Sequence, residues 1–169
     1  DRIQHIDANH ADLLFREARN HNWWQEKDVT DDQLREIYDL LKYGSTSSNT
    51  QPARLIFIRS QEAKEKLKPC LAPPNVEKTM LAPVTALLAY DLEFHEDFAQ
   101  NYPVRPEMAD RFRNDAAVAE KFAFQQGTLQ GAYLIIAARA LGLDTGAMSG
   151  FDNDAVDTEF FLDDPEMKT

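Results

Sequence analysis

The long helical pattern at residues 115–141 constrains the fold of this chain more than any other feature, because apolar residues recur there at helical spacing throughout. Its large apolar side chains lie roughly along one face: Val118, Phe122, Leu129, Tyr133 and Ile136. Gly127 and Gly131 are four residues apart and leave room for another helix to approach closely. The C-terminal half is almost wholly apolar, which predicts a helix at the centre of the domain or at a subunit interface.

Two apolar runs predict buried strands. Residues 55–59 begin with Leu-Ile-Phe-Ile, and residues 84–90 read Val-Thr-Ala-Leu-Leu-Ala-Tyr, as in strands covered on both faces. A short strand is also expected at about residues 144–148. Strands that alternate with helices predict a layered domain of the α/β or α+β class. The length of 169 residues fits a single domain over residues 1–169.

The remaining helices are predicted from apolar spacing and capping signals. They are expected at residues 10–19, 30–43, 61–68 and 73–78 and after residues 150–152. Thr30 and Gln33 form a capping box, and Gly44 ends the helix that follows. The helix at 61–68 carries mixed charge and is predicted to be exposed. The adjacent Trp23 and Trp24 are expected to pack against other residues.

Residues 92–114 are rich in aromatic and charged side chains and are interrupted by Pro103 and Pro106. Irregular structure or short helices are predicted there, and a mobile lid is one interpretation.

The formal net charge of −11 bears on the partners of the protein. A duplex-binding protein needs a cationic footprint, so nucleic acid is not an expected partner. Any anionic ligand must be held by a local group of Arg, Lys and backbone N–H donors, because long-range steering works against it. Cys70 is the single cysteine, which excludes an intrachain disulfide, fits a reducing compartment and is interpreted as a packing residue.

No membrane association is expected from the sequence. The longest non-polar run, residues 132–138, has seven residues, far fewer than a bilayer-spanning helix needs. Residues 1–5 show no basic region followed by an apolar core, so no signal peptide is predicted and the cytoplasm is the expected compartment. The chain begins without Met, and we expect a native protein to extend beyond both ends.

Four polar or glycine-bearing segments lie where helices or strands end and are candidates for one ligand site. They are residues 19–22, residues 46–51, the pair Asn75 and Lys78 on one helix face, and residues 147–150 with unpaired backbone N–H groups. A guanidinium, an ammonium, several amides and N–H donors suit a ligand with a phosphate and a flat heterocyclic edge. Taken singly, each segment also fits a surface charge, a solvated face, an ordinary polar loop or a helix entry. No cluster has metal-ligand spacing, so no metal is predicted.

The four segments, in this order, resemble the motifs of the nitroreductase family of FMN-dependent NAD(P)H oxidoreductases. The matching stretches are residues 19–22, residues 45–52 (Ser-Thr-Ser-Ser-Asn-Thr-Gln-Pro), residues 75–78 (Asn-Val-Glu-Lys), residues 141–143 (Leu-Gly-Leu) and residues 150–152 (Gly-Phe-Asp). Within the family, Arg-Asn-His-Asn-Trp at 19–23, Pro-Ala-Arg at 52–54 and Met-Ser-Gly-Phe-Asp at 148–152 look most like the malonic semialdehyde reductase (3-hydroxypropionate dehydrogenase) branch of pyrimidine catabolism.

The resemblance implies the roles of the site residues. Arg19, with Asn20 or His21, would hold the FMN phosphate. The loop residues Thr46, Ser47 and Asn49 would line the ring and the ribityl chain. The pyrimidine edge would meet Asn75 and Lys78, and Met148, Ser149 and Gly150 form the segment whose N–H groups would lie near flavin N5 and O4.

The resemblance also implies the chemistry and the assembly. NAD(P)H would deliver a hydride to flavin N5 and then give its place to a small-molecule acceptor in a ping-pong cycle, reducing malonic semialdehyde to 3-hydroxypropionate. No catalytic proton donor is assigned. The family fold has a central mixed sheet flanked by helices, and the long helix lies at the interface of an intertwined homodimer with FMN between the subunits.

The chain departs from the family pattern at several positions. Ala18, Asn20 and Asn22 stand where Arg, Ser and a third basic residue are usual, Ser45 replaces a Pro, and Ala53 replaces an aromatic residue. The basic C-terminal residues that help bind phosphate would lie beyond Thr169. Two alternatives stay open: a nitroreductase- or dehalogenase-like flavin reductase of other acceptors, and a non-catalytic flavin-binding protein on the same fold.

Overall fold

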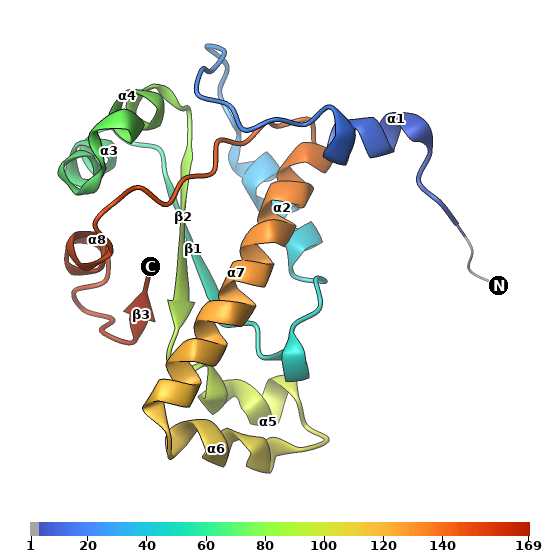
Figure 1. Ribbon diagram of the computed structural model, residues 1–169, viewed down its shortest axis with the longest axis vertical. Helices are drawn as coiled ribbons and strands as arrows, with labels where there is room; N and C mark the ends of the chain where they lie inside the picture. The colour runs from blue at the N-terminus through green and yellow to red at the C-terminus, as the bar shows by residue number, and fades with distance from the viewer. Residues whose placement is uncertain (1–3) are drawn as a thin grey trace.

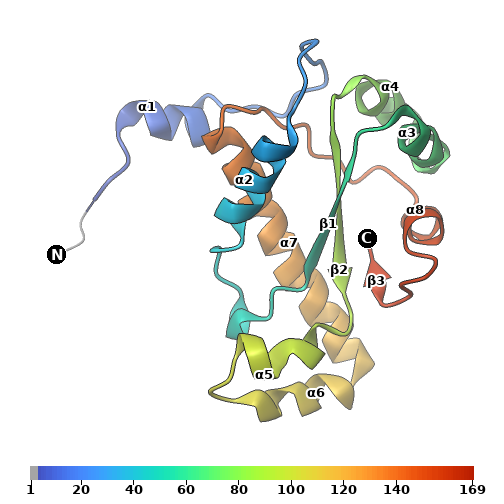
Figure 2. The same cartoon turned by 180° about the vertical axis from the view of Figure 1, so that it is seen from behind.

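The computed structural model describes residues 4–169, so part of the stretch tested for a signal peptide lies outside the described residues (Figures 1 and 2). Its centre is a three-stranded sheet with the order β1-β2-β3, and both strand pairings are antiparallel. The strands are β1 (Ala53–Ile58), β2 (Thr85–Asp91) and β3 (Met167–Lys168). The two long strands therefore form within a residue or two of their predicted bounds.

The helices surround this sheet. The described α-helices are α1 (Ala8–Ala11), α2 (Asp31–Leu41), α3 (Gln61–Leu67), α4 (Pro73–Leu81), α5 (Phe98–Asn101), α6 (Ala109–Arg113), α7 (Ala116–Ala140) and α8 (Asn153–Phe160). A π-helical turn (Asp12–Arg16) continues α1, and short 3₁₀ turns lie at Ser47–Asn49, Lys68–Cys70, Phe94–Asp97 and Pro106–Met108. None of the described helices is apolar enough over sufficient length to cross a bilayer.

Three layers result from the alternation of apolar side chains along the strands. Ile56 and Ile58 of β1 pack with α3 and α8 on one face, while Leu55 and Phe57 pack with α2 and α7 on the other. Figure 1 shows α7 and α2 on one side of the sheet and α3, α4 and α8 on the other. Cys70 lies buried in the first of these cores, where burial raises the pKa of its thiol, so its interpretation as a packing residue is confirmed.

Helix α2 forms as the capping signal predicts. The Thr30 hydroxyl accepts a hydrogen bond from Gln33 N, and the Gln33 side chain accepts one from Thr30 N. Its inward face is buried, as the spacing of Leu34, Ile37 and Leu41 requires.

The packing face of α7 differs from the prediction. Its buried positions are mostly small residues: Ala119, Ala123, Gly127, Gln130, Ala137 and Ala138. A Cβ on Gly131 would lie 2.6 Å from Leu88 Cδ2, so the glycines allow close approach to the sheet rather than to another helix. Part of the predicted face also packs within this chain, because Val118 and Phe122 contact the aromatic residues of the 92–114 segment and Tyr133 packs with α2. Leu129 of that face remains 40% exposed, and Phe124, which lies outside it, is 55% exposed. The packing face therefore combines some of the predicted large residues with small residues that the prediction left out.

Residues 92–114 form the short helices that were predicted, and they build an aromatic cluster of their own. Phe94, Phe98 and Phe112 are buried there, and the Phe94 and Phe122 rings stack with centroids 5.7 Å apart. This cluster fastens the segment to the N-terminal end of α7. The lid motion stays a prediction.

The strand predicted at 144–148 is wrong, because β3 is the third strand and residues 144–148 pair with the N-terminal segment. A single parallel bridge joins Asn20 to Thr145. Gly146 lies directly against the His21 carbonyl and the Trp24 ring, which keeps this stretch away from the sheet edge.

Two helical details and one on the tryptophans also differ from expectation. The first helical segment ends at Arg16 rather than at residue 19. Helix α3 is not simply exposed, because Lys64 and Leu67 are buried. Trp24 is half-buried, but Trp23 is 71% exposed in the single chain, so only one of the two tryptophans packs as expected.

Candidate functional site

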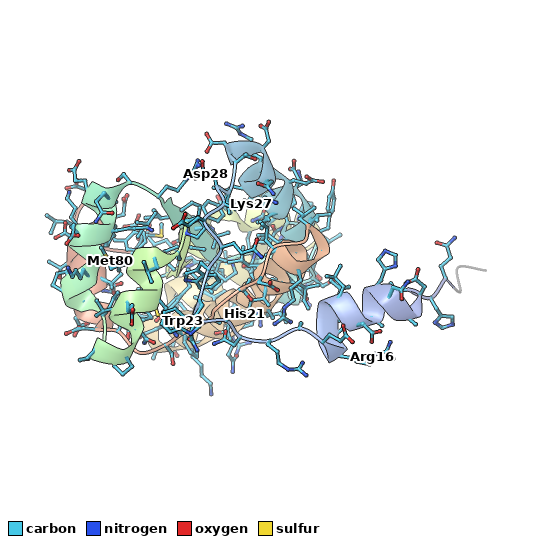
Figure 3. The ribbon with its side chains drawn as sticks, turned by 90° about the horizontal axis from the view of Figure 1, so that it is seen from above. Arg16, His21, Trp23, Lys27, Asp28 and Met80 are labelled. Atoms are coloured by element: carbon cyan, nitrogen blue, oxygen red, sulfur yellow. The ribbon has the colours of Figure 1, made fainter. Side chains whose placement is uncertain are left out.

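Residues 19–22 and 144–147 lie side by side at the C-terminal end of α7. His21 N donates to Thr145 O over 3.0 Å, and Asn20 Nδ2 donates to Ala147 O over 3.2 Å. Seen from above in Figure 3, the segment with His21 and Trp23 crosses the body of the protein, while the helical segment with Arg16 projects to one side. The first and fourth predicted segments are thus brought together.

Helix α4 joins this pair of segments. Asn75 Nδ2 donates to Gly150 O over 2.8 Å, and Lys78 Nζ lies 3.3 Å from Asn22 Oδ1. Trp24 Nε1 donates to the Lys78 carbonyl over 2.7 Å, which ties the segment to the same helix. Gly150 leaves room for this contact, because a Cβ would lie only 2.5 Å from Asn75 Nδ2 and would displace the amide. Three of the four predicted segments therefore converge.

The C-terminal end of α4 is held by a buried lysine. Lys64 Nζ donates to Met80 O over 3.2 Å and also to Ala82 O. Burial lowers the pKa of Lys64, and the two carbonyls at the helix end compensate its charge. The burial of Lys64 has no signal in the sequence, because this residue lies within a run of mixed charge that is typical of an exposed helix.

The individual side chains of the converged cluster differ in how they are engaged. The exposed Arg19 donates through Nη1 to the carbonyls of Arg16 and Ala18, over 2.9 and 2.8 Å, so it caps the preceding helical turn. His21 Nε2 lies 3.6 Å from Asp144 Oδ1. Thr79 Oγ1 donates to Asn75 O over 2.7 Å within α4, and the sulfur of the half-buried Met148 lies 3.7 Å from the same oxygen. The N–H groups of Ser149 and Gly150 donate to no other residue in the described part of the chain.

The second predicted segment lies elsewhere. Asn49 Nδ2 donates to Asn101 O at the end of α5 over 2.8 Å, and Ser47 N donates to Gln126 Oε1 of α7 over 2.8 Å. Both ribbon views show α5 and this loop at the opposite end of the molecule from α4 (Figures 1 and 2). Thr46, Ser47 and Asn49 therefore do not meet the converged cluster within one chain.

The backbone of this loop is unusual. Ser48, Asn49 and Gln51 have positive φ angles of 52°, 52° and 44° although none is glycine. Each such residue costs roughly 1–3 kcal/mol and persists only where the surrounding structure holds it in place. Thr46 Oγ1 accepts from Gln51 N over 3.2 Å, and Gln51 Nε2 donates to Asn49 Oδ1 over 2.6 Å. A strained, cross-linked loop of this kind is typical of a functional site.

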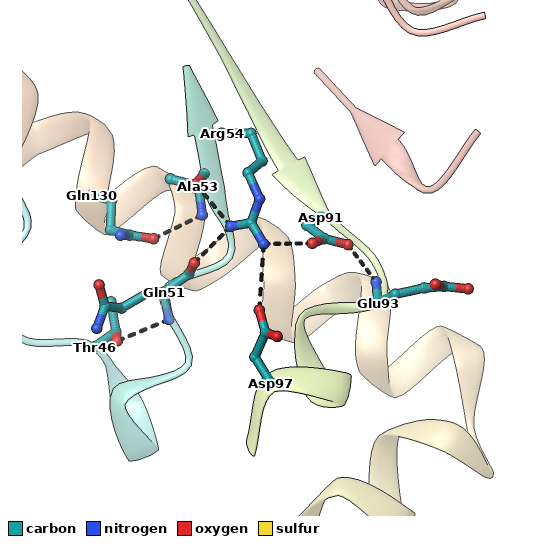
Figure 4. A network of polar contacts seen from close by, with 8 residues as sticks. All are labelled: Thr46, Gln51, Ala53, Arg54, Asp91, Glu93, Asp97 and Gln130. Carbon is teal, nitrogen blue, oxygen red and sulfur yellow. Dashed lines mark hydrogen bonds and ion pairs between the residues drawn. The ribbon is translucent and has the colours of Figure 1, made fainter. Parts of the chain in front are cut away.

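A polar network fixes the end of the loop to the sheet and to α7 (Figure 4). Gln130 Oε1 accepts from Ala53 N over 2.8 Å. Arg54 Nη1 donates to Gln51 O over 3.0 Å, and its Nη2 donates to Asp91 Oδ2 over 2.6 Å. This network was not among the predicted site residues. Its one local signal is the pair of glutamines, residues 126 and 130, four apart on a largely apolar helix.

A cleft of about 1140 Å³ runs between the converged cluster, β2 and α7. Of the predicted site residues, His21, Lys78, Met148 and Ser149 line it, whereas Arg19, Asn20, Asn75 and Gly150 do not. Apolar side chains such as Leu88 and Ile135 line it as well. This volume suits a cofactor-sized ligand. The donors are cationic or N–H groups, which fit an anionic phosphate and the carbonyl-bearing edge of a flavin ring. No group of three His, Cys, Asp or Glu residues within residues 4–169 could hold a metal ion.

The layered α+β fold of this chain is the fold of solved nitroreductases. A solved protein of Exiguobacterium sibiricum 255-15, described as a nitroreductase in complex with FMN, matches this structure with a TM-score of 0.84. The alignment covers 96% of this chain and 85% of that one at 18% identity, so it shows the shared fold.

The chain belongs to the nitroreductase family, because the sequence model of that family, described as "Nitroreductase family", matches residues 19–168. A protein of Cupriavidus pinatubonensis, whose name describes an NADH dehydrogenase/NAD(P)H nitroreductase, is 54% identical over 152 residues, which cover 89% of this chain and 78% of that protein. HadB of Ralstonia pickettii, with the same description, is 54% identical over 150 residues, covering 88% of this chain and 76% of HadB. The predicted family and the enzyme class of oxidoreductase are thereby confirmed.

Proposed function

We propose that this protein is an FMN-dependent NAD(P)H oxidoreductase whose flavin site forms between two copies of the chain. The observation that carries the proposal is the separation of two complementary half-sites. The donors around Asn75 and Lys78 converge at one end of the molecule, while the strained loop at residues 46–51 lies at the other. A second copy can bring its loop to the first copy's cluster, and the exposed apolar side chains of α7 offer a surface for that contact.

In this proposal, Arg19 with Asn20 or His21 holds the phosphate of FMN. Lys78 and Asn75 meet the pyrimidine edge, Ser149 and Gly150 donate their N–H groups in the Met148 segment, and the loop residues Thr46, Ser47 and Asn49 come from the second copy. The Lys78 ammonium and the N–H groups of Ser149 and Gly150 are donors and support this assignment, as do the names of the relatives, which describe NAD(P)H-dependent enzymes.

Bound FMN would supply hydride transfer between NAD(P)H and the acceptor. The chain's own residues orient the ring, exclude water and stabilise charge. The Lys78 ammonium, held near Asn22, provides a positive charge where negative charge develops during reduction. Reductant and acceptor stack in turn at one place, which gives a ping-pong cycle. No residue is assigned as a proton donor.

The proposed acceptor is malonic semialdehyde, reduced to 3-hydroxypropionate as a step of pyrimidine catabolism in the cytoplasm. The motifs at residues 19–23, 52–54 and 148–152 support this branch. A nitro compound is the second candidate acceptor, because the two relatives at 54% identity are described as NAD(P)H nitroreductases. Steady consumption of NADH or NADPH with each acceptor in turn separates the two.

The first test is a visible absorption spectrum of the purified protein with FMN, before and after NADPH or NADH. A bound-flavin spectrum that bleaches supports the proposal, and no flavin uptake by a folded protein refutes it. Arg19→Ala is expected to lower FMN affinity about tenfold, and Lys78→Ala to lower kcat by roughly ten- to a hundredfold. Arg35→Ala, which removes an exposed ion pair with Asp32 on α2, is the matched control and is expected to change neither.

Complementation tests the shared site directly. Lys78→Ala damages one half-site and Asn49→Ala the other, so each variant alone is expected to be weakly active. Subunits reassociated from an equal mixture form heterodimers with one intact site each, and activity is expected to recover to about one quarter of wild type. Activity equal to the average of the two variants would place both residues in one subunit's site.

A further inference from the structure

The loop at residues 46–51 depends on contacts from outside itself. Its left-handed residues include Gln51, with φ 44°, directly before the buried Pro52. Within the loop, Gln51 N is held by Thr46 Oγ1. The carbonyl of Gln51 is held by Arg54 Nη1 over 3.0 Å. Both backbone polar groups of the strained residue are thus paired, one locally and one by a side chain of β1.

The guanidinium of Arg54 is itself anchored (Figure 4). Its Nη2 donates to Asp91 Oδ2 over 2.6 Å, and the Asp91 side chain is 10% exposed. Asp91 Oδ1 accepts from Glu93 N over 2.7 Å, which fixes the carboxylate at the end of β2. Asp97, in the 3₁₀ turn before α5, lies 3.9 Å from the same Nη2. Arg54 therefore joins the loop, the sheet and the 92–114 segment.

We propose that Arg54 is a positioning residue for the flavin site: anchored by Asp91, it holds the Gln51 carbonyl and thereby the arrangement of Thr46, Ser47 and Asn49. This inference rests on the proposed function for its catalytic meaning. The role requires arginine rather than lysine. One side-chain nitrogen must donate to the Gln51 carbonyl while another donates to the Asp91 carboxylate, and only the planar guanidinium of arginine presents two nitrogens in this way.

The test compares Arg54→Met with Arg59→Met. Arg59 lies just past the end of the same strand and also joins a carboxylate and a carbonyl, those of Asp31 and Val29, but it does not touch the loop. A double variant, Arg54→Met with Asp91→Asn, removes the charge that the single variant leaves unpaired and so protects against misfolding. The thermal midpoint of each variant reports the general loss of stability.

Two readouts follow. Hydrogen exchange of the loop amides in the flavin-free protein is expected to accelerate about tenfold or more in both Arg54 variants and to stay unchanged in Arg59→Met. FMN affinity is expected to fall by a similar factor, with a changed visible circular dichroism of the bound flavin. Arg54→Lys is expected to behave as Arg54→Met does, because lysine keeps the positive charge but has one nitrogen in place of the two that contact the Gln51 carbonyl and the Asp91 carboxylate.

The outcomes separate this inference from the proposed function. Unchanged loop exchange in both Arg54 variants overturns the positioning role, whether or not the protein binds FMN. An FMN affinity that falls equally in Arg54→Met and Arg59→Met also overturns it. If the wild-type protein takes up no FMN but loop exchange still accelerates, the flavin function fails while the control of the loop by Arg54 stands.

Discussion

Gly146→Ala is the substitution that most directly tests how the converged cluster is built. A Cβ at this position would lie against the His21 carbonyl oxygen, well inside the 3.0 Å that such contacts require, and 2.9 Å from Trp24 Cη2. The obstacle is backbone on one side and a half-buried ring on the other. No side-chain rotation relieves the contact with the carbonyl, so the segment at residues 20–24 must move or the strain must remain.

The cost follows from the two available responses. If the segment stays, overpacking costs roughly 1–3 kcal/mol. If it leaves, the three hydrogen bonds donated by His21 N, Asn20 Nδ2 and Trp24 Nε1 are lost, at about 1 kcal/mol each, together with the exposed one that Asn22 accepts from Lys78. The recovered freedom of the segment offsets part of that loss. Either response lowers the free energy of unfolding by about 1–3 kcal/mol. Departure of the segment also separates residues 20–24 from Ala147 and Lys78.

The assay combines thermal unfolding, tryptophan fluorescence and FMN titration. We expect a red-shifted emission, because Trp24 becomes hydrated, and FMN affinity lowered at least tenfold. Gly142→Ala is the matched control. It has a positive φ of 74° and open space around its Cβ, so it costs about 1 kcal/mol without touching the segment. Equal FMN affinity in the two variants would refute the reasoning that Gly146 keeps the half-site together.

Three further outcomes are expected. Lys64→Met leaves two carbonyls at the end of α4 without a buried donor, so chemical denaturation is expected to show a loss of about 1–3 kcal/mol. The hydrogen bond from Arg113 lowers the pKa of Glu96, so this pair stabilises the fold above pH 4.5 and less as the pH falls through the folded-state pKa. Arg113→Met and wild type are therefore expected to differ in thermal midpoint at pH 7 and to converge in acid. Thr30→Ala removes the cap of α2 and is expected to cost about 1 kcal/mol, measured by denaturation, whereas an unchanged midpoint would contradict the capping role.

Local signals in the sequence predicted local structure well. The capping box at Thr30 and the long apolar period after Asp115 produced α2 and α7 close to their predicted bounds, because caps and helical spacing depend on neighbours within a few residues. The two buried strands are confirmed for the same reason. The order of polar motifs, through a family resemblance, led to the correct family.

Contacts between residues far apart in the chain could not be predicted from local sequence patterns. The stretch at 144–148 has the composition of a strand, but its partner is the segment at 20–24, which no local signal specifies. The burial of Lys64 depends on the end of a helix 16 to 18 residues further along the chain. The separation of the loop from the other three segments likewise follows from the length and direction of α7.

The placement of small and large side chains around α7 determines which of its positions can change in sequence. Its inner face is built of alanine and glycine against the sheet, where an added methyl group meets Leu88 or Tyr90. Its outer face carries large exposed side chains such as Leu129 and Phe124, of which Phe124 meets the Tyr90 ring edge-on. Substitutions that exchange one large apolar residue for another on the outer face leave the fold intact while they reshape the surface. The inner face is therefore expected to be nearly invariant among relatives, and divergence along this helix is expected to fall on the side that meets other molecules.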